Sequence, residues 1–353
     1  MKLLSTFLKS IFFSTVIGLS ANAQSVVTDP VGFVNITIAA GTGSTKTVTP
    51  ISLPLLAATS ASGQTVGQIT GVTANSFTNT NANWTPGQLS GPSTPHVFRV
   101  TSGVAKGRTF LVSVTFANTA TTLTIDSLDL VNITNNDLAT LGVVNGDTYA
   151  LYACDTLSGL FGNPTSTAIV GGTSASAADS VILAVNGALA TYYYNTTNAR
   201  WTRSSLGSPD ATNIPIRPDA GISFSRIGNT PITLSITGGV PTIIRQASIV
   251  NSGVTYLAQG WPVDLTISSC AIQNTPSWVS NPSPSVADTI QVADTVSGVI
   301  KTYWFDGTNW RRQSLGSPIS DGDLVTQGSS ITINKRGTTA GASVLSQNTP
   351  YTL

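Results

Sequence analysis

The amino-acid sequence predicts an all-β protein made of tandem antiparallel β-sandwich or open-barrel domains, on three observations. The chain of 353 residues has no Glu and a single Met, while Val, Ile, Thr, Gly and Asn are abundant. Val, Ile and Thr suit strands, and Gly, Asn and Pro suit turns, whereas Glu, Lys and Met favour helices. Apolar residues alternate with polar ones, and a block of sequence recurs after 109 residues, the distance from Asp179 to Asp288.

The first 23 residues have the pattern of a cleavable export signal. Lys2 and Lys9 precede a short apolar run over 11–19, and Ala-Asn-Ala at 21–23 supplies the small-x-small cleavage pattern. The apolar run is much shorter than the ~20 residues that a membrane-spanning helix needs. We therefore expect cleavage after Ala23, no transmembrane helix, and a mature chain in the periplasm, on the outer surface or in the extracellular medium.

Strands are indicated by alternation with a period of two. Apolar residues occupy every second position from Phe110 to Phe116 and from Ile232 to Ile236. Asp306-Gly307 stands between the aromatic strand 302–305 and a strand that begins near Trp310, which is a strong hairpin signal. Such short strands with frequent turns are typical of antiparallel sheets.

The recurring block contains an Ala-Asp pair, an aromatic strand, a Trp and the phrase Ser-Leu-Gly-Ser-Pro. Its paired copies are Ala178-Asp179 and Ala287-Asp288, 191–195 and 302–306, Trp201 and Trp310, and 205–209 and 314–318. A five-residue identity inside a longer aligned block indicates a duplication. Weaker matches, such as Thr148-Tyr149 with Thr255-Tyr256, extend each copy upstream. The predicted organisation is a signal peptide at 1–23, an N-terminal β-domain at 24–141 that is a candidate third copy, and repeat units at 142–248 and 249–353.

These motifs resemble an uncharacterised family of exported, β-rich bacterial proteins. The phrases that carry the resemblance, besides the repeated blocks, are Asp-Pro-Val-Gly-Phe-Val at 29–34, Asp-Thr-Leu-Ser-Gly-Leu-Phe-Gly at 155–162 and Thr-Pro-Tyr at 349–351. The resemblance covers most of the mature chain. It implies export and a β-rich fold, and no known activity.

Charge and residue types narrow the classes of function. Without Lys2 and Lys9 the mature chain has 14 basic and 15 acidic residues, so it has no electrostatic reason to bind nucleic acid. His96 is the only histidine, which disfavours a histidine-based nucleophile and excludes metal sites built on several His or Cys ligands. Asp-Gly turns such as 321–323 offer oxygen ligands for calcium, but plain turn chemistry is the favoured interpretation, and no cofactor is expected.

Paired carboxylates leave an Asp-dependent glycoside hydrolase as one alternative function. Asp179 and Asp288, which recur between the copies, are its candidates, together with Asp155 and Asp264. Recurrence in both copies favours a structural role, since one catalytic pair would suffice. Each Asp follows Ala and precedes a strand, where its side chain can accept a backbone N–H, so replacement of both by Asn is expected to perturb folding modestly.

Aromatic side chains are the candidates for a binding surface. The six candidates are Tyr192, Tyr194, Trp201, Tyr303, Phe305 and Trp310. If they were exposed, they could stack on sugar rings or anchor a protein, as in a carbohydrate-binding module. The favoured interpretation is that they fill the core. Cys154 and Cys270 are a candidate disulfide, worth ~4 kcal/mol in the chain-entropy model, with two separately buried thiols as the equal alternative.

The sequence therefore favours an exported, non-enzymatic structural or interaction protein of the bacterial cell envelope or surface. Its expected partners are proteins or further copies of the chain, with a glycan as the alternative. A carbohydrate-binding module and an Asp-dependent glycoside hydrolase are the two competing functions.

Overall fold

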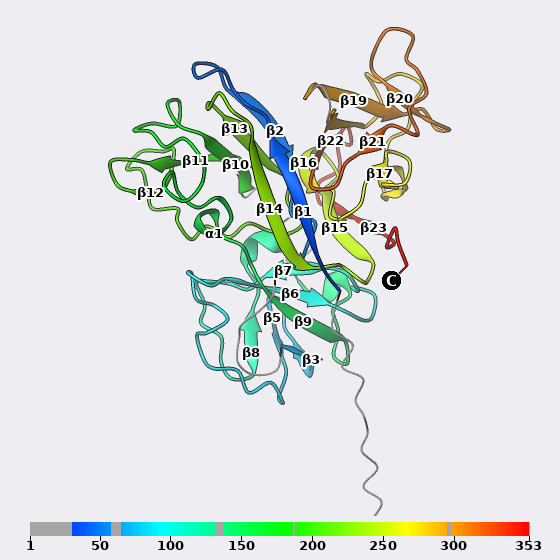
Figure 1. Ribbon diagram of the computed structural model, residues 1–353. Coiled ribbons are helices and arrows are strands. Elements are labelled where there is room, and N and C mark those ends of the chain that lie inside the picture. Colours follow the sequence, from blue (N-terminus) through cyan, green and yellow to red (C-terminus); the bar gives the residue numbers. More distant parts are fainter. Residues whose placement is uncertain (1–29, 58–64, 132–136, 186–187, 295–297, 353) are drawn as a thin grey trace, which may run out of the picture.

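A computed structural model gives the fold and describes residues 30–57, 65–131, 137–185, 188–294 and 298–352 (Figure 1). All pairs of named strands are antiparallel, and the one α-helix in these ranges, α1, spans only Leu157–Phe161. The all-β class predicted from composition and alternation is confirmed. The expected export signal at 1–23 lies outside the described residues.

The middle domain is assembled from two separate stretches of the chain. Its strands are β1 (Val31–Ile38), β2 (Thr47–Ile51), β10 (Ser180–Val185), β11 (Ala188–Asn195), β12 (Arg200–Arg203), β13 (Ile222–Arg226) and β14 (Ile232–Gly239). Five strands form a sheet in the order β12-β11-β10-β13-β2, and β1 pairs with β14 as a two-stranded ribbon. Apolar side chains from both, including Ile36 of the ribbon and Phe224 of the sheet, meet Phe161 of α1 in one core.

Between β2 and α1 the chain forms an inserted domain. Its strands are β3 (Val66–Gln68), β4 (Gly71–Val72), β5 (Ser76–Thr78), β6 (His96–Val100), β7 (Thr109–Leu111), β8 (Thr122–Thr124) and β9 (Thr148–Ala153). They form two sheets, in the orders β3-β9-β6-β7 and β4-β5-β8. Phe77 and Phe98 stack in its core with ring centroids 4.0 Å apart, beside Tyr149. The short apolar strands therefore close on a core of their own.

The C-terminal domain is continuous in sequence. Its strands are β15 (Arg245–Val250), β16 (Gly253–Ala258), β17 (Leu265–Thr266), β18 (Thr289–Ala293), β19 (Ile300–Phe305), β20 (Trp310–Arg312), β21 (Leu324–Val325), β22 (Ser330–Lys335) and β23 (Ala342–Gln347). The main sheet has the order β16-β22-β18-β19-β20, and β15 pairs with β23. Asp306 joins β19 to β20 and accepts hydrogen bonds from the backbone of Thr308 and Asn309, as the hairpin signal predicts.

The middle and C-terminal domains share one strand plan. The strands β2, β13, β10, β11 and β12 hold the same places in one sheet as β16, β22, β18, β19 and β20 hold in the other. The ribbon β1–β14 corresponds in the same way to β15–β23. The middle domain is complete only with β1 and β2, because these two strands supply the backbone partners of β14 and β13.

This arrangement differs from the domain boundaries expected at 24–141 and 142–248. Residues 31–51 belong to the middle domain, and the inserted domain runs on to β9, which pairs with β3 and β6. Thr148-Tyr149 in β9 and Thr255-Tyr256 in β16 therefore lie in strands that do not correspond. The strand predicted from Phe110 to Phe116 also ends early, at Leu111, and Phe116 is exposed.

Figure 1 shows the inserted domain below the other two, with the three domains meeting near β7, β1 and β15. Arg217 of the middle domain forms an ion pair with Asp126 of the inserted domain at 3.2 Å. The backbone N–H of Gln246 in β15 donates to the carbonyl of Gly107 at 3.2 Å. The hydroxyl of Ser52 donates to the carbonyl of Ser329 at 2.6 Å, which links the middle and C-terminal domains. We call this region the three-domain junction.

Candidate functional site

The aromatic side chains proposed as a binding surface are buried, which corrects that hypothesis. Tyr192, Trp201, Tyr303 and Trp310 are at most 3% exposed, and the half-buried Tyr194 and Phe305 pack against the cores. The indole N–H of Trp201 donates to the carbonyl of Gly162 at 2.8 Å, and that of Trp310 donates to Gln273 at 3.2 Å. Both faces of β11 and β19 are covered, since Tyr193 and Trp304 on the other face are buried as well. These residues therefore offer no flat platform for a sugar.

The recurrent carboxylates are structural in their surroundings. Asp179 accepts hydrogen bonds from the backbone N–H groups of Val170 and Ile227, and its Oδ2 lies 2.6 Å from Nη1 of Arg226. Asp288 accepts from the backbone of Val279 and Arg336 and pairs with Lys335.

Each carboxylate thus links the start of the central strand of its domain to the end of the neighbouring strand. These strands are β10 and β13 for Asp179, and β18 and β22 for Asp288. Asp179 and Asp288 are 1% and 0% exposed, and they lie in different domains rather than facing one cleft. A pair of carboxylates on either side of a glycosidic bond requires a shared cleft. This geometry does not match the catalytic pair considered for a glycoside hydrolase.

Cys154 and Cys270 are free and buried in separate apolar clusters, so the candidate disulfide is not formed. The thiol of Cys154 donates to the carbonyl of Ile216 at 3.2 Å. Burial raises the pKa of both thiols to about 12, which keeps them protonated and poor nucleophiles. His96 is buried at the start of β6, where burial lowers the pKa of the imidazole.

The most distinctive exposed features are two loops with one sequence, which we call the tip loops: Ser205–Pro209 after β12 and Ser314–Pro318 after β20. In each loop the fourth residue donates its backbone N–H to the carbonyl of the first at 3.0 Å. The third residue, Gly207 or Gly316, has a φ of +79° or +78°. This hydrogen bond and this φ are those of a type II turn, which favours Gly at its third position.

The two tip loops agree beyond the turn itself. Ser208 and Ser317 both have a φ of +43°, in the left-handed region that a residue with a side chain rarely adopts. Each loop is also closed at its base, because Arg203 donates its backbone N–H to Pro209 and Arg312 donates to Pro318. The same sequence therefore has the same conformation in two domains.

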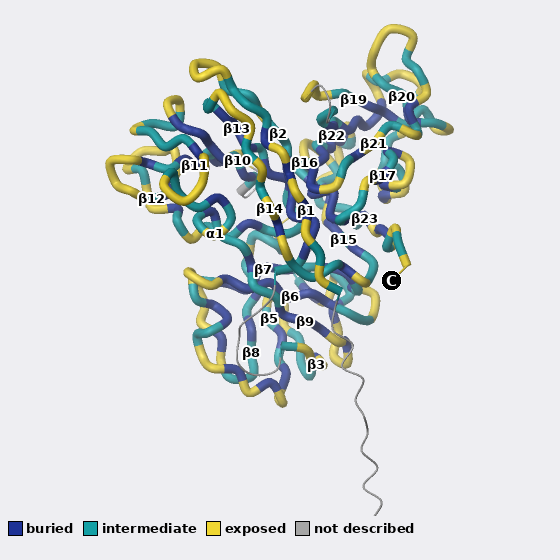
Figure 2. The backbone as a smooth tube through the Cα atoms, in the orientation of Figure 1, coloured by how far each residue is buried: buried dark blue, intermediate teal, exposed yellow. Residues whose placement is uncertain are grey.

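Each tip loop holds a leucine at the second position of the turn, in full contact with water. Leu206 is 104% exposed and Leu315 is 103% exposed, which places them among the most exposed apolar side chains of the described residues. Figure 2 shows exposed backbone beside β12 and β20, and these strands lie at the outer ends of two different domains. The repeated phrase is evident in the sequence, but the exposure of its leucine was not predicted. The feature that could have indicated exposure is an apolar residue directly before Gly-Ser-Pro, which is typical of a turn.

A shallow polar groove of about 620 Å³ lies on the outer face of the C-terminal sheet. Its lining includes Gln291, Thr302, Gln313 and Asn334. Gln313 immediately precedes the second tip loop. Amide and hydroxyl groups of this kind can donate to and accept from a hydroxyl-rich ligand.

Among the described residues no group of three His, Cys, Asp or Glu side chains could hold a metal ion. Within the same ranges, no helix combines the length and the apolar character that crossing a membrane requires.

No protein-family model, curated protein or solved structure matches this chain. The resemblance to an uncharacterised exported family therefore stays a prediction.

Proposed function

We propose that this chain is an exported, non-enzymatic interaction protein of the bacterial cell envelope or surface, which binds protein partners or further copies of itself through its two tip loops. The observation that carries the proposal is the pair of identical turns, each of which holds a fully exposed leucine. Export is proposed from the signal pattern at 1–23.

A single exposed apolar residue is ordinary on a protein surface. Leu206 and Leu315 are different, because each stands at the same place of the same turn in its own domain. Leucine at this place adds nothing to either core, and the left-handed serine two residues later costs conformational energy. A preformed turn loses little freedom when its leucine enters an apolar pocket, which favours binding.

The position of the tip loops indicates bridging. The loops extend from the sheet edges β12 and β20, which Figure 1 places far apart on the middle and C-terminal domains. One chain can therefore contact two partners at once, each through an apolar pocket that admits one leucine. Two weak contacts of this kind reinforce each other strongly when both engage the same assembly.

The test compares the mature chain with a double variant, Leu206→Thr with Leu315→Thr. A matched control carries Leu189→Thr with Leu324→Thr, because these leucines are 55% and 58% exposed, one in each of the same two domains. Sedimentation velocity measures self-association, and fractionation of cells measures retention in the envelope. We expect the tip-loop variant to lose self-association or envelope retention and the control to keep both. Unchanged behaviour of the tip-loop variant in both assays would contradict the proposal.

The non-enzymatic part of the proposal has a separate test. Asp179 and Asp288 are buried in ion pairs, and Cys154 and Cys270 are buried thiols of raised pKa, so these groups are poorly placed for turnover. The purified protein is assayed against chromogenic glycosides and esters. Hydrolysis by the pure protein that is lost after one carboxylate substitution would overturn this assignment.

Glycan binding is kept as the second candidate function because of the polar groove, not the aromatic residues. If it is correct, replacement of Gln291 and Asn334 by Ala weakens binding to an immobilised glycan panel. The tip-loop variant then binds glycan as the unchanged chain does.

A further inference from the structure

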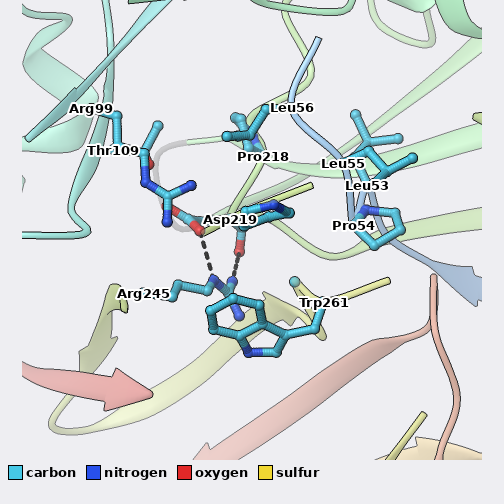
Figure 3. A pocket seen from close by; sticks show the side chains of 12 residues that line it. Leu53, Pro54, Leu55, Leu56, Arg99, Thr109, Pro218, Asp219, Arg245 and Trp261 are labelled. Atoms are coloured by element: carbon cyan, nitrogen blue, oxygen red, sulfur yellow. Dashed lines mark hydrogen bonds and ion pairs between the residues drawn. The ribbon is translucent and has the colours of Figure 1, made fainter. Parts of the chain in front are cut away.

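A small cavity lies at the three-domain junction, and every domain contributes to its wall (Figure 3). Leu53–Leu56 come from the middle domain, Arg99 and Thr109 from the inserted domain, and Arg245 and Trp261 from the C-terminal domain. The cavity has a volume of about 20 Å³. A volume of this size holds about one water-sized species.

Three arginines converge on this junction, and each is only 4% exposed: Arg99, Arg108 and Arg245. Arg245 is well satisfied, since its Nε lies 2.8 Å from Oδ1 of Asp219 and its Nη1 donates to the carbonyl of Ala258 at 2.8 Å. Figure 3 shows Arg99 pointing toward the same carboxylate from the opposite wall.

The other two arginines have donors without acceptors. Arg99 donates from Nη2 to the carbonyl of Ile244 at 3.2 Å, but its Nε has no partner among the described residues. Arg108, which does not line the cavity, donates from Nη1 to Ser248 at 3.0 Å, while its Nε and Nη2 have no partner in the same part of the chain. A buried donor without an acceptor is costly, and a buried cation without a counter-charge costs more.

The charges at the junction are therefore unbalanced. Among the residues that line the cavity, the guanidinium groups of Arg99 and Arg245 face one carboxylate, that of Asp219, which already pairs with Arg245. Burial lowers the pKa of Arg99, and it lowers that of Arg108 to about 10. An arginine guanidinium stays protonated in proteins, so the side chains that line the cavity, Arg99 and Arg245 against Asp219, carry one more positive than negative charge.

We propose that the cavity binds one small monovalent inorganic anion of the halide class, which lies beside the guanidinium groups of Arg99 and Arg245 and offsets the positive charge that Asp219 leaves unbalanced. Room for about one water-sized species favours a small anion over phosphate or sulfate. The carboxylate of Asp219 on the same wall disfavours a dianion, because like charges in a buried site repel strongly.

Binding of this anion holds the three domains together. Arg99 belongs to the inserted domain and Arg245 to the C-terminal domain. Asp219 belongs to the middle domain, in the segment between β12 and β13. A ligand that binds the folded protein and not the unfolded chain raises stability with its concentration. The anion is thus a structural ligand of the junction, and this role is independent of the tip loops.

The direct test is a crystal structure of the mature chain grown in sodium bromide. We expect an anomalous bromide peak in the cavity within hydrogen-bond distance of Arg99. Ordinary water density without an anomalous peak at this place would overturn the proposal.

The second test measures the melting temperature in sodium chloride and in sodium gluconate at equal ionic strength, since gluconate is too large for the cavity. We expect a higher melting temperature in chloride, and we expect Arg99→Gln to abolish this difference. Arg203→Gln, at an exposed position, serves as the control that keeps it. An equal chloride effect in Arg99→Gln contradicts the proposal, and if that variant does not fold, the bromide peak decides.

Discussion

The carboxylate of Asp179 and the guanidinium of Arg226 form a buried ion pair, with Oδ2 2.6 Å from Nη1 and the two side chains 0% and 2% exposed. Asp288 and Lys335 form the corresponding pair in the C-terminal domain, and the partners are 47 residues apart in both cases. The acid is the same in both domains, while the base differs. Asp suits both positions because its two oxygens also accept hydrogen bonds from backbone N–H groups of two separate segments.

Replacement of Asp179 by Asn should therefore destabilise the protein by about 3–5 kcal/mol, because it leaves the buried Arg226 without its counter-charge. This exceeds the modest effect expected from the sequence. Asp210→Asn is the control, since Asp210 pairs with Arg200 at 3.5 Å and its side chain is 55% exposed. Such surface pairs contribute about 1 kcal/mol or less. Urea denaturation measures both, and equal losses would show that burial of the Asp179 pair is unimportant.

In the C-terminal domain, the double variant Asp288→Asn with Lys335→Met should recover stability relative to Asp288→Asn alone. The single change leaves a buried ammonium group, which is 0% exposed, without its carboxylate, whereas the double change removes both charges. A double-mutant cycle in urea measures the coupling. Strictly additive losses would mean that the two side chains do not interact.

The buried thiols should make the protein less stable above pH 9. Burial raises the thiol pKa of Cys154 and of Cys270 from 9.0 to about 12. Between pH 9 and pH 12 the unfolded chain releases thiol protons that the folded chain keeps. The thiols therefore leave the free energy of unfolding undiminished below pH 9. As the pH rises towards 12, this free energy falls by roughly 1.4 kcal/mol per pH unit for each thiol.

Thermal unfolding between pH 8 and pH 11 checks this slope, which should be smaller in Cys270→Ala. Thiol-specific reagents should label both cysteines only after unfolding, and mass analysis should show two thiols. Rapid labelling of the folded protein at pH 8 would be inconsistent with the buried positions.

Gly260→Ala should destabilise the junction more than an ordinary glycine substitution. Gly260 has a φ of +82°, and a Cβ atom there would lie 2.5 Å from Nη1 of Arg245. Gly307→Ala is the control, because Gly307 also has a positive φ, +107°, but its Cβ would meet nothing within 4 Å. The control should lose about 1–2 kcal/mol, the general cost of a left-handed residue with a side chain. Equal melting temperatures for the two variants would show that Arg245 can move away freely.

The strand plan predicts which fragments fold. A fragment of residues 242–353 contains every strand of the C-terminal domain and should unfold cooperatively. A fragment of residues 142–248 lacks β1 and β2, so β14 and β13 lose their partners and the middle core loses Ile51 and Leu53. Circular dichroism and thermal melting should show the first fragment folded and the second unfolded. A cooperative transition in the second would refute the assignment of β1 and β2 to the middle domain.

Local sequence was enough to specify the class of the elements and several of their positions. The alternation of Ile232, Leu234 and Ile236 places β14 correctly, and Asp306-Gly307 marks the hairpin between β19 and β20. These features depend on residues close together in the chain, so the alternation of side chains and the turn residues are evident from the sequence alone. The conformation of the tip loops has the same origin, since the same five residues form the same turn twice.

Partner strands, burial and the junction depended on contacts between distant residues. Alternation marks two faces of a strand, but it does not show whether the second face is covered, and Tyr193 and Trp304 are buried there. The backbone hydrogen bonds that assign β2 to β13 join residues 171 to 179 positions apart and carry no side-chain signature. Arg99 and Arg245 likewise meet only because three domains fold onto one another, since each arginine taken alone has the sequence surroundings of an ordinary surface strand.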